Sequence, residues 1–366
     1  MAVITSIVAR VAGATVLIVL VLTILVFGIG SCAFAAPGYT GPRTANFDGS
    51  RFRNQTPIRE HGFSDLLRWT FTRHRGEWSE VTDFEPGAPP AESVEDLRVT
   101  FVNHSTVLIQ VAGLNILTDP ICSERTSPVS FAGPKRYHPA GIRFEDLPQI
   151  DLVIISHNHY DHMDIPTLKR LYAEHRPRYI VGLGNRRLLR DNGIDGVTEL
   201  DWWQGADIAQ DMRVVFVPAQ HFSGRGIGDR NKTLWGGYVV ESKRGNVYFA
   251  GDTGWGPHFE QIAARYSPIR FAILPIGAYQ PAWFMSPVHI NPAEALEAQA
   301  ILRAEYAMGI HFGTFSLADD GQYDPLIDLN LAQTTGPVRR DQFWVLDFGE
   351  SRDVPEIPVA RVIAAE

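Results

Sequence analysis

Residues 156–162 read SHNHYDH and directly follow the apolar run LVII at residues 152–155. This HxHxDH pattern places three histidines and one aspartate within six positions, where a buried strand is expected to end. Neutral imidazole nitrogens and ionised carboxylates are the usual non-thiol ligands of zinc and related cations. A turn at a strand end lets alternate side chains converge on one point. The pattern therefore predicts a metal site, in preference to a polar turn whose histidines only bond to neighbouring backbone groups.

Three other strand-like runs also end on a residue type that binds metals. The run VVFV at 214–217 leads to His221, the run VYFA at 247–250 leads to Asp252, and the run AMGI at 307–310 leads to His311. One histidine after a strand is more often structural than a metal ligand. Four such strand ends in one chain favour a shared site, because active-site residues gather on loops at one edge of a sheet.

In these segments the chain resembles the metallo-β-lactamase superfamily, whose pattern is HxHxDH followed by His, Asp and His. It is most similar to the branch that contains N-acylphosphatidylethanolamine-hydrolysing phospholipase D, and the resemblance extends from about residue 40 to about residue 350. It implies an α/β (α+β) fold, a four-layer αββα sandwich of two mixed sheets with helices outside. The stretches that carry it are DP at 119–120, GPKR at 133–136, residues 156–164, PAQH at 218–221, LWGG at 234–237, GDTG at 251–254, LPIGAY at 274–279 and GIHFGTF at 309–315.

The resemblance also implies which residues bind the metals and perform the chemistry. His157, His159 and His221 would hold one ion, Asp161, His162 and His311 a second, and Asp252 would bridge both. Seven ligands without a thiolate suit two divalent metal ions of zinc type, although iron and manganese also accept such ligands. We expect Asp161 and His289 to be catalytic residues. His289 would orient the phosphate or protonate the leaving oxygen, and a purely structural role is the alternative.

Other catalytic classes lack their motifs in this chain. None of the 12 histidines begins the HxK pattern of the unrelated phospholipase D superfamily. The sequence also has no GxSxG nucleophile turn, no GxxxxGKS/T phosphate loop and no GxGxxG dinucleotide loop. Its net charge of −8 at pH 7 disfavours broad nucleic-acid binding, so we expect no nucleic-acid partner. Water activated by metal is the nucleophile that these observations support.

The N-terminal region is the second informative segment. Residues 11–37 carry no charge, and residues 14–30 are mostly Val, Leu, Ile and Phe, which approaches the length of about 20 residues that spans a bilayer. We expect residues 1–37 to be a transmembrane anchor or a signal segment, since AFA at 33–35 resembles a cleavage site. A buried helix of the fold is the alternative. The protein is thus predicted to be membrane-associated through this segment, with the side of the membrane left open.

The rest of the chain divides into three parts. We expect a linker and amphipathic extension at 38–95, a catalytic domain at 96–350 and a C-terminal tail at 351–366. The extension includes a short amphipathic helix at 63–73, which either docks on the core or lies at a lipid surface. The catalytic domain is expected to have sequential antiparallel strands at 97–102, 106–111 and 114–118, and helices at 165–175, 186–191, 259–266 and 291–304.

Several polar residues near these motifs allow two interpretations. His104 follows the first expected strand and fits a supporting or turn residue better than a ligand. Lys135, Arg136 and Arg225 lie in loops near the motifs, where they would either receive a phosphate or, as the simpler interpretation, pair with neighbouring protein groups. The contacts of these side chains distinguish the two interpretations.

The resemblance and the residues together predict a dinuclear metal-dependent phosphodiesterase of phospholipase D type. It would hydrolyse N-acylphosphatidylethanolamine-like phospholipids to phosphatidic acid and N-acylethanolamine by attack of a metal-bound hydroxide. The expected partners are a phospholipid substrate and a membrane, and a homo-oligomer is compatible with the sequence. One alternative is a lactonase or other small-ester metallohydrolase. A different class is a membrane-tethered metal-binding scaffold with a vestigial site.

Overall fold

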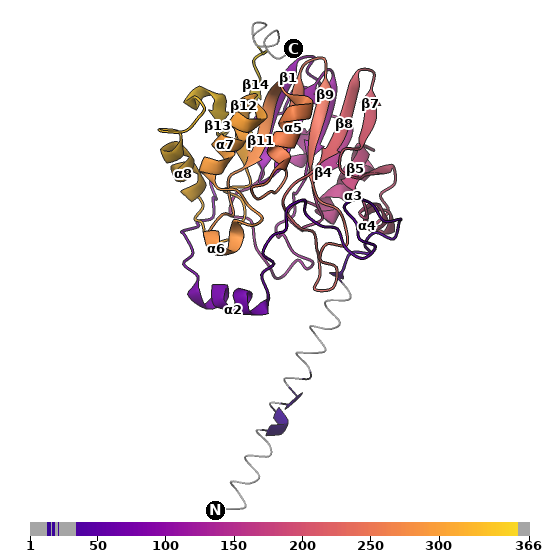
Figure 1. The fold of residues 1–366 in the computed structure, drawn as a ribbon. Helices are drawn as coiled ribbons and strands as arrows, with labels where there is room; N and C mark the ends of the chain where they lie inside the picture. Colours follow the sequence, from indigo (N-terminus) through magenta and orange to yellow (C-terminus); the bar gives the residue numbers. More distant parts are fainter. Residues whose placement is uncertain (1–12, 16, 19–20, 22–33, 358–366) are drawn as a thin grey trace, which may run out of the picture.

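The computed structural model describes residues 34–357 and, before them, residues 13–15, 17–18 and 21. In this part of the chain, two seven-stranded sheets pack face to face (Figure 1). The first sheet contains, in chain order, β1 (Leu97–Asn103), β2 (Thr106–Val111), β3 (Leu114–Thr118), β4 (Leu152–Ile155), β5 (Arg178–Gly182), β6 (Val197–Leu200) and β14 (Ser351–Asp353). The second contains β7 (Gly205–Ala209), β8 (Met212–Val217), β9 (Gly237–Ser242), β10 (Asn246–Phe249), β11 (Ile269–Pro275), β12 (Ala304–Ile310) and β13 (Phe343–Trp344).

The two sheets share one pairing pattern. In the first sheet, β1, β2 and β3 pair antiparallel, and β3 to β6 pair parallel. In the second sheet, β7 to β10 pair antiparallel, and β10 to β13 pair parallel. Both sheets are therefore mixed, which confirms the predicted α/β fold. The three antiparallel strands expected at the start of the catalytic domain are β1, β2 and β3.

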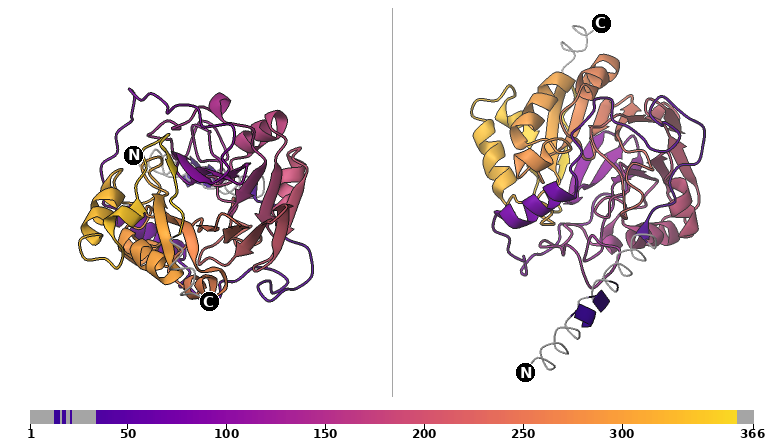
Figure 2. Two further views of the ribbon diagram at one scale, coloured as in Figure 1. Left: turned by 90° about the horizontal axis from the view of Figure 1, so that it is seen from above. Right: turned by 60° about the horizontal axis from the view of Figure 1, so that its bottom comes forward.

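Helices cover the outer faces of the sheets (Figure 2). The first sheet carries α3 (Ile165–Glu174) and α4 (Arg186–Asp191). The second carries α5 (His258–Tyr266) and α7 (Pro292–Leu302), with α8 (Asp324–Ala332) beside α7. From residue 36 to residue 357, the other helices are α2 (Phe63–Thr72), α6 (Ala282–Met285), η1 (Phe144–Asp146) and η2 (Arg340–Gln342). The capping box predicted at the start of α7 is present, because Asn291 and Glu294 each accept a hydrogen bond from the other's backbone N–H.

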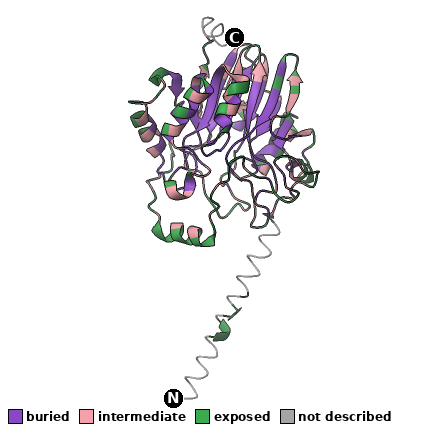
Figure 3. Ribbon diagram, viewed as in Figure 1, coloured by how far each residue is buried: buried purple, intermediate pink, exposed green. Residues whose placement is uncertain are grey.

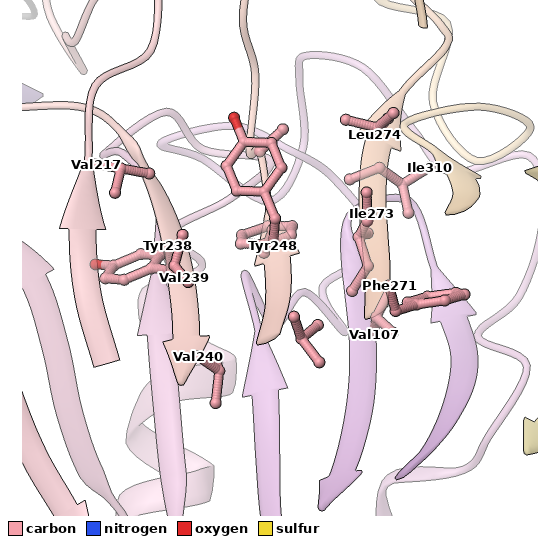
Figure 4. Packing of buried hydrophobic residues seen from close by; sticks show 14 of the residues in the cluster. Val107, Val217, Tyr238, Val239, Val240, Tyr248, Phe271, Ile273, Leu274 and Ile310 are labelled. Atoms are coloured by element: carbon pink, nitrogen blue, oxygen red, sulfur yellow. The ribbon is translucent and has the colours of Figure 1, made fainter. Parts of the chain in front are cut away.

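The main hydrophobic core lies between the two sheets. Strands such as β4 and β11 are continuous apolar runs, as expected when both faces of a strand are covered. Figure 4 shows Val107 of the first sheet packed with Phe271 and Ile273 of the second. The hydroxyl of Tyr238 in β9 crosses this core and donates to the backbone carbonyls of Ile155 and Ile180, at 2.8 and 2.9 Å. The sheets are thus joined by a polar contact as well as by apolar packing.

Residues 36–56 form an extended segment, which we call the strap. It contacts the loop between β8 and β9. Its Tyr39, Phe47 and Phe52 form a cluster of aromatic rings with centroids 4.7 to 5.6 Å apart. The backbone N–H groups of Tyr39 and Phe52 donate to the carbonyls of Lys232 and Asn231, both at 2.8 Å. Residues far apart in the sequence are therefore held together here.

The predicted helix after the strap is present as α2, and it contacts α6. Trp69 stacks on Phe284 at a centroid distance of 4.7 Å and donates from its indole nitrogen to Asp319. Most residues of α2 are exposed (Figure 3). Phe63 and Phe71 are among them. The helix is thus attached to the domain through a few aromatic and polar contacts.

The C-terminal strand β14 runs along the first strand of the catalytic domain. Arg98 pairs with Asp353 in antiparallel register, and their side chains also form a salt bridge. Because β1 runs toward the loop that carries His104, β14 runs away from that loop. The described chain therefore ends at the side of the domain opposite α2 and α6 (Figure 1).

Among the described residues, no helix has the length and apolar character needed to cross a membrane. The longest helix from α2 onward is α7 with 11 residues, whereas a bilayer-spanning helix needs about 20. This finding contradicts the predicted membrane association through residues 1–37. Most of that segment lies outside the described residues, as does most of the predicted tail at 351–366.

Candidate metal centre

The HxHxDH loop begins where β4 ends, as its sequence predicts. His157 and His162 are almost completely buried, and Asp161 is buried with 8% of its surface exposed. The Nε2 atom of His157 lies 2.8 Å from Nδ1 of His159. The loop therefore folds back so that side chains two residues apart face the same point.

Three loops of the second sheet bring His221, Asp252 and His311 to the same place. β8, β10 and β12 run in one direction, because β8 and β10 both pair antiparallel with β9, and β10 and β12 both pair parallel with β11. Their carboxyl ends consequently meet at one edge of the sheet. His221 lies four residues after β8, Asp252 three after β10, and His311 directly after β12.

Gly251 allows the second-sheet loops to approach the HxHxDH loop. Its φ of +61° lies in the left-handed region, which residues with a side chain rarely adopt. A Cβ atom at this position would lie 2.5 Å from Cβ of Ser156, closer than van der Waals contact permits. The glycine before Asp252 is therefore required for the close contact between the two sheets at the site.

The Oδ2 atom of Asp252 lies at the centre of the cluster. Its neighbours are Nε2 of His162 and His311 at 3.2 Å, Nε2 of His221 at 3.8 Å, Nε2 of His157 at 4.0 Å and Nδ1 of His289 at 4.0 Å. One carboxylate oxygen thus contacts histidines from both predicted ligand sets.

Asp161 defines a second group of contacts. Its Oδ2 lies 3.0 Å from Nε2 of His104, 3.2 Å from Nε2 of His162 and 3.4 Å from Nε2 of His311. His157, His159 and His221 form a separate group whose ligand atoms lie within 4.8 Å of one another. The structure brings all seven predicted residues into one cluster, and their role as ligands stays a prediction.

Burial keeps several of the imidazoles neutral. It lowers the pKa of His157 and of His221 well below the usual value for histidine, and it lowers the pKa of His159 to about 4. Neighbouring imidazoles lower these pKa values further. A neutral imidazole keeps a lone pair for a cation, so these side chains are in the protonation state that metal binding needs.

The carboxylates have the opposite effect on two other histidines. Burial alone would lower the pKa of His162 and His311, but Asp252 and Asp161 raise the first well above its usual value and the second to about 9. Burial alone would raise the pKa of Asp252, but His162 and His311 hold it well below its usual value. The two carboxylates therefore favour positive charge at this point.

Buried polar atoms that make no hydrogen bond also fit a cation. Buried atoms without a hydrogen-bond partner include Nε2 of His162, Nε2 of His311, Oδ1 of Asp252 and Nδ1 of His289. Such atoms are costly inside a protein unless something binds them. Their chemistry, imidazole nitrogen and carboxylate oxygen, matches divalent cations of zinc type.

Asp119 supports the HxHxDH loop, a role that the sequence analysis missed. Its Oδ2 lies 2.7 Å from Nδ1 of His162, and its carboxylate also accepts from the backbone and hydroxyl of Ser156. This contact points Nε2 of His162 toward the cluster. Its position in the sequence could have indicated this role, because Asp119 directly follows β3 just as the predicted ligands follow their strands.

His104 lies closer to the cluster than its sequence suggested. It follows β1, and its backbone carbonyl accepts a hydrogen bond from the N–H of His311 at 2.8 Å. Both residues have positive φ, +45° and +65°, in the left-handed region that residues with a side chain adopt infrequently. Burial lowers the pKa of His104 to about 3, so it presents a neutral imidazole to Asp161. His104 is therefore a further candidate member of the site.

His289 borders a cavity of about 510 Å³ between α6, α7 and α8. Tyr279, Asn291 and Asp328 also line this cavity. Burial lowers the pKa of His289 to about 4. The residue thus connects the Asp252 cluster with a space large enough for part of an organic substrate.

The three basic residues considered for phosphate binding have structural partners. Arg225 donates to the backbone carbonyls of Asn158 and Met163, both at 2.9 Å. Arg136 donates to the carbonyl of Ser123, and Lys135 pairs with Glu80. These contacts support the structural interpretation.

Comparisons with known proteins agree with this geometry. A family model described as the beta-lactamase superfamily domain matches residues 114–312. The "N-acyl-phosphatidylethanolamine-hydrolyzing phospholipase D 1" of Caenorhabditis elegans is 37% identical over 270 residues, covering 70% of this chain and 76% of the relative. A protein of Methanopyrus kandleri named as a metal-dependent hydrolase is 29% identical over 225 residues, covering 60% of this chain and 85% of its own length.

The solved structures that resemble the chain support the fold. An isothiocyanate hydrolase from Delia radicum gut bacteria superimposes with a TM-score of 0.54 at 19% sequence identity. The match covers 70% of this chain and 98% of that protein. At this identity the similarity concerns the arrangement of sheets and helices.

Proposed function

The chain belongs to the metallo-β-lactamase superfamily of hydrolases, and from this premise we propose that it is a dinuclear phosphodiesterase of phospholipase D type. Its proposed substrates are N-acylphosphatidylethanolamine-like phospholipids. The name of the Caenorhabditis elegans relative supports this substrate class, and the position of Asp252 supports the two-metal site. The contact of one Asp252 oxygen with both histidine groups is the observation that carries the proposal.

The proposed ligand sets follow from the contacts. His157, His159 and His221 would hold one divalent ion, Asp161, His162 and His311 the second, and Asp252 would contribute to both. Two such ions, when bound, would lower the pKa of water to about 7 and stabilise negative charge on the phosphoryl oxygens. The protein groups have the further tasks of orienting the substrate and excluding bulk water.

His289 is the proposed catalytic residue at the cavity. Because its pKa lies at about 4, its ring is neutral near pH 7 and has one N–H to donate. That N–H would form a hydrogen bond with a phosphoryl oxygen or with the oxygen of the leaving alcohol. The neighbouring cavity would receive one substituent of the phosphodiester.

The proposed hydrolysis breaks the bond between phosphorus and the ethanolamine oxygen. The oxygen of water becomes part of phosphatidic acid, and a proton of water goes to the alkoxide to give N-acylethanolamine. Running the reaction in ¹⁸O-labelled water tests this assignment. We expect the label in phosphatidic acid, whereas label in N-acylethanolamine would show cleavage of the carbon–oxygen bond instead.

A substrate comparison tests the function as a whole. Metal-loaded protein would be assayed against an N-acyl phosphatidylethanolamine, a simple aryl phosphodiester and a lactone. We expect turnover of the phospholipid that requires metal and disappears with a chelator. Lactone turnover without phosphodiester cleavage would replace the proposal with a lactonase. Two bound metals without turnover of any substrate would favour a vestigial site.

A further inference from the structure

The strap reaches the candidate metal centre through Asn54. This residue lies before residues 114–312, the part of the chain that the family model matches. The strap is fixed to the domain at several points that do not involve Asn54. The backbone N–H of Ala36 donates to Asp229 at 2.7 Å, and the side-chain amide of Gln220 donates to the carbonyl of Thr56 at 2.9 Å. Both ends of the strap are therefore anchored to the domain, and Asn54 lies between the two anchors.

The side chain of Asn54 binds both backbone groups of His221. Its Nδ2 donates to the carbonyl oxygen of His221 at 2.8 Å, and its Oδ1 accepts from the N–H of His221 at 3.1 Å. The indole nitrogen of Trp235 also donates to Oδ1, at 3.0 Å. A side-chain amide that pairs with the N–H and the C=O of one residue fixes the position and the direction of that residue's main chain.

His221 depends on such a contact because it lies beyond the end of β8. The strand ends at Val217, and the bridge between Gln220 and Gly254 holds the residue just before His221. The N–H and the C=O of His221 itself are bound by Asn54 and not by a neighbouring strand. Its ring is oriented separately, since Nδ1 lies 2.9 Å from the carbonyl oxygen of Val288. Asn54 fixes the main chain and Val288 fixes the ring, which leaves Nε2 directed toward His159 and Asp252 at 3.4 and 3.8 Å.

We propose that Asn54 is a positioning residue of the metal centre, and that strap docking and metal binding at His221 strengthen each other. The proposal rests on the metal site of the proposed function but not on the substrate. Coupling of this kind is reciprocal, so the factor by which the docked strap raises metal affinity equals the factor by which metal favours the docked strap. Its tests use metal and protease only, and they remain valid if the phospholipid proposal fails.

The first test compares two asparagines of the same strap. Asn54→Ala removes both contacts with His221. Asn46→Ala is the matched control, because Nδ2 of Asn46 also ties the strap to the domain, at Asp201 Oδ1 (3.0 Å), but does not contact a predicted ligand. Chelator competition with Zn²⁺ measures affinity, and the absorption spectrum of the Co²⁺-loaded protein reports ligand geometry.

We expect Asn54→Ala to lower the affinity for one of the two Zn²⁺ ions by about 10- to 100-fold, as for other residues that orient metal ligands. Its Co²⁺ spectrum should differ from that of the parent, and Asn46→Ala should match the parent in both measurements. Parental affinity and spectrum in Asn54→Ala would overturn the proposal. An equal loss of Zn²⁺ affinity in Asn46→Ala would also overturn it, because docking of the strap, and not the contact of Asn54 with His221, would then set the affinity.

Asn54→Asp provides a second variant in case Asn54→Ala does not fold. It keeps an acceptor for the N–H of His221 and for Trp235, but it replaces the donor that faces the carbonyl of His221 with an oxygen. We expect weakened binding of one Zn²⁺ ion and a changed Co²⁺ spectrum. Parental values in this variant would overturn the proposal.

Limited proteolysis tests the reverse direction of the coupling. Arg43, Arg51 and Arg53 of the strap are exposed and offer trypsin sites. We expect Zn²⁺ to slow cleavage at these arginines in the parent and in Asn46→Ala, and to have little effect on it in Asn54→Ala. Cleavage of the parent at a rate independent of Zn²⁺ would overturn the proposed coupling.

Discussion

The two sheets differ in the number of loops that carry their site residues. The first sheet places His157, His159, Asp161 and His162 on one loop after β4, whereas the second sheet places His221, Asp252 and His311 on three loops after β8, β10 and β12. The first loop is supported nearby, by Asp119 and Ser156. The dispersed residues depend on distant groups, including Asn54 and Val288 for His221. A compact motif therefore specifies half of the site locally, while the other half is specified by tertiary structure.

Removing Asp252 tests whether the two halves share a ligand. We expect Asp252→Ala to lower kcat/KM by about 10³-fold or more and to reduce bound metal from two equivalents toward one, because one oxygen contacts both histidine groups. Steady-state kinetics and elemental analysis measure the two effects. Asp207→Ala, at an exposed position in β7, is the control. Two retained metal ions in Asp252→Ala would show that the halves bind independently.

Weakening Asp119 tests the local support of the first loop. Asp119→Asn changes the partner of His162 Nδ1 from a carboxylate to an amide, so we expect metal affinity to fall by about 10- to 100-fold. Chelator competition gives the affinity. Unchanged metal affinity would mean that the HxHxDH loop keeps its geometry without the carboxylate of Asp119. Local support would then not distinguish this loop from the loops of the second sheet.

Acid should destabilise the second sheet through His258. This buried residue of α5 lies 3.1 Å from the hydroxyl of Thr253, next to Asp252, and burial lowers its pKa to about 3. Unfolded histidine binds a proton near pH 6.5, so His258 contributes stability that is present above that pH and is lost as pH falls toward about 3. Between about pH 7.5 and about pH 5, this contribution should fall by about 2 kcal/mol.

Urea unfolding of the parent and of His258→Gln at both pH values measures the effect. The variant should lose about 2 kcal/mol less stability on acidification, because its side chain does not titrate. An equal loss in both proteins would assign the acid sensitivity to other groups.

Tyr238 tests the contact between the two sheets. Tyr238→Phe removes the hydroxyl that reaches the carbonyls of Ile155 and Ile180, and we expect a loss of about 1 kcal/mol in the free energy of unfolding. Tyr172→Phe, at a partly buried position of α3 whose hydroxyl does not join the two sheets, is the control and should change stability less. Because Ile155 immediately precedes the HxHxDH loop, an accompanying loss of metal affinity would show that sheet packing also sets the site.

The difference between the single loop after β4 and the three loops of the second sheet explains which site residues the sequence could predict. HxHxDH is contiguous, and His221, Asp252 and His311 each end an apolar run, so strand-end reasoning and the family resemblance both reached them. His104 has the same strand-end position but no motif around it, and Asp119 lies in the DP stretch at 119–120, to which the resemblance assigned no role. Asn54 could not be recognised, because it lies 167 positions before His221 and acts through that residue's backbone.

The prediction for the N-terminus failed for a different reason. It used hydropathy, the absence of charge and a cleavage-like site, whereas the described residues include no helix able to cross a membrane. The phosphate interpretation of Arg225 had a similar weakness, since charge does not reveal that backbone carbonyls already bind the guanidinium. The case of Arg225 shows that composition identifies a candidate residue and that its contacts decide between the interpretations.

The antiparallel pairing of β14 with β1 has a practical consequence. β1 leads toward His104 and the metal centre, and β14 therefore carries the chain away from it. A surface linkage or fluorescent probe attached at β14 would lie on the side of the domain away from the cavity at His289. Immobilising the protein through that end should leave the site facing bulk solution, so that substrate exchange could be measured on a tethered enzyme.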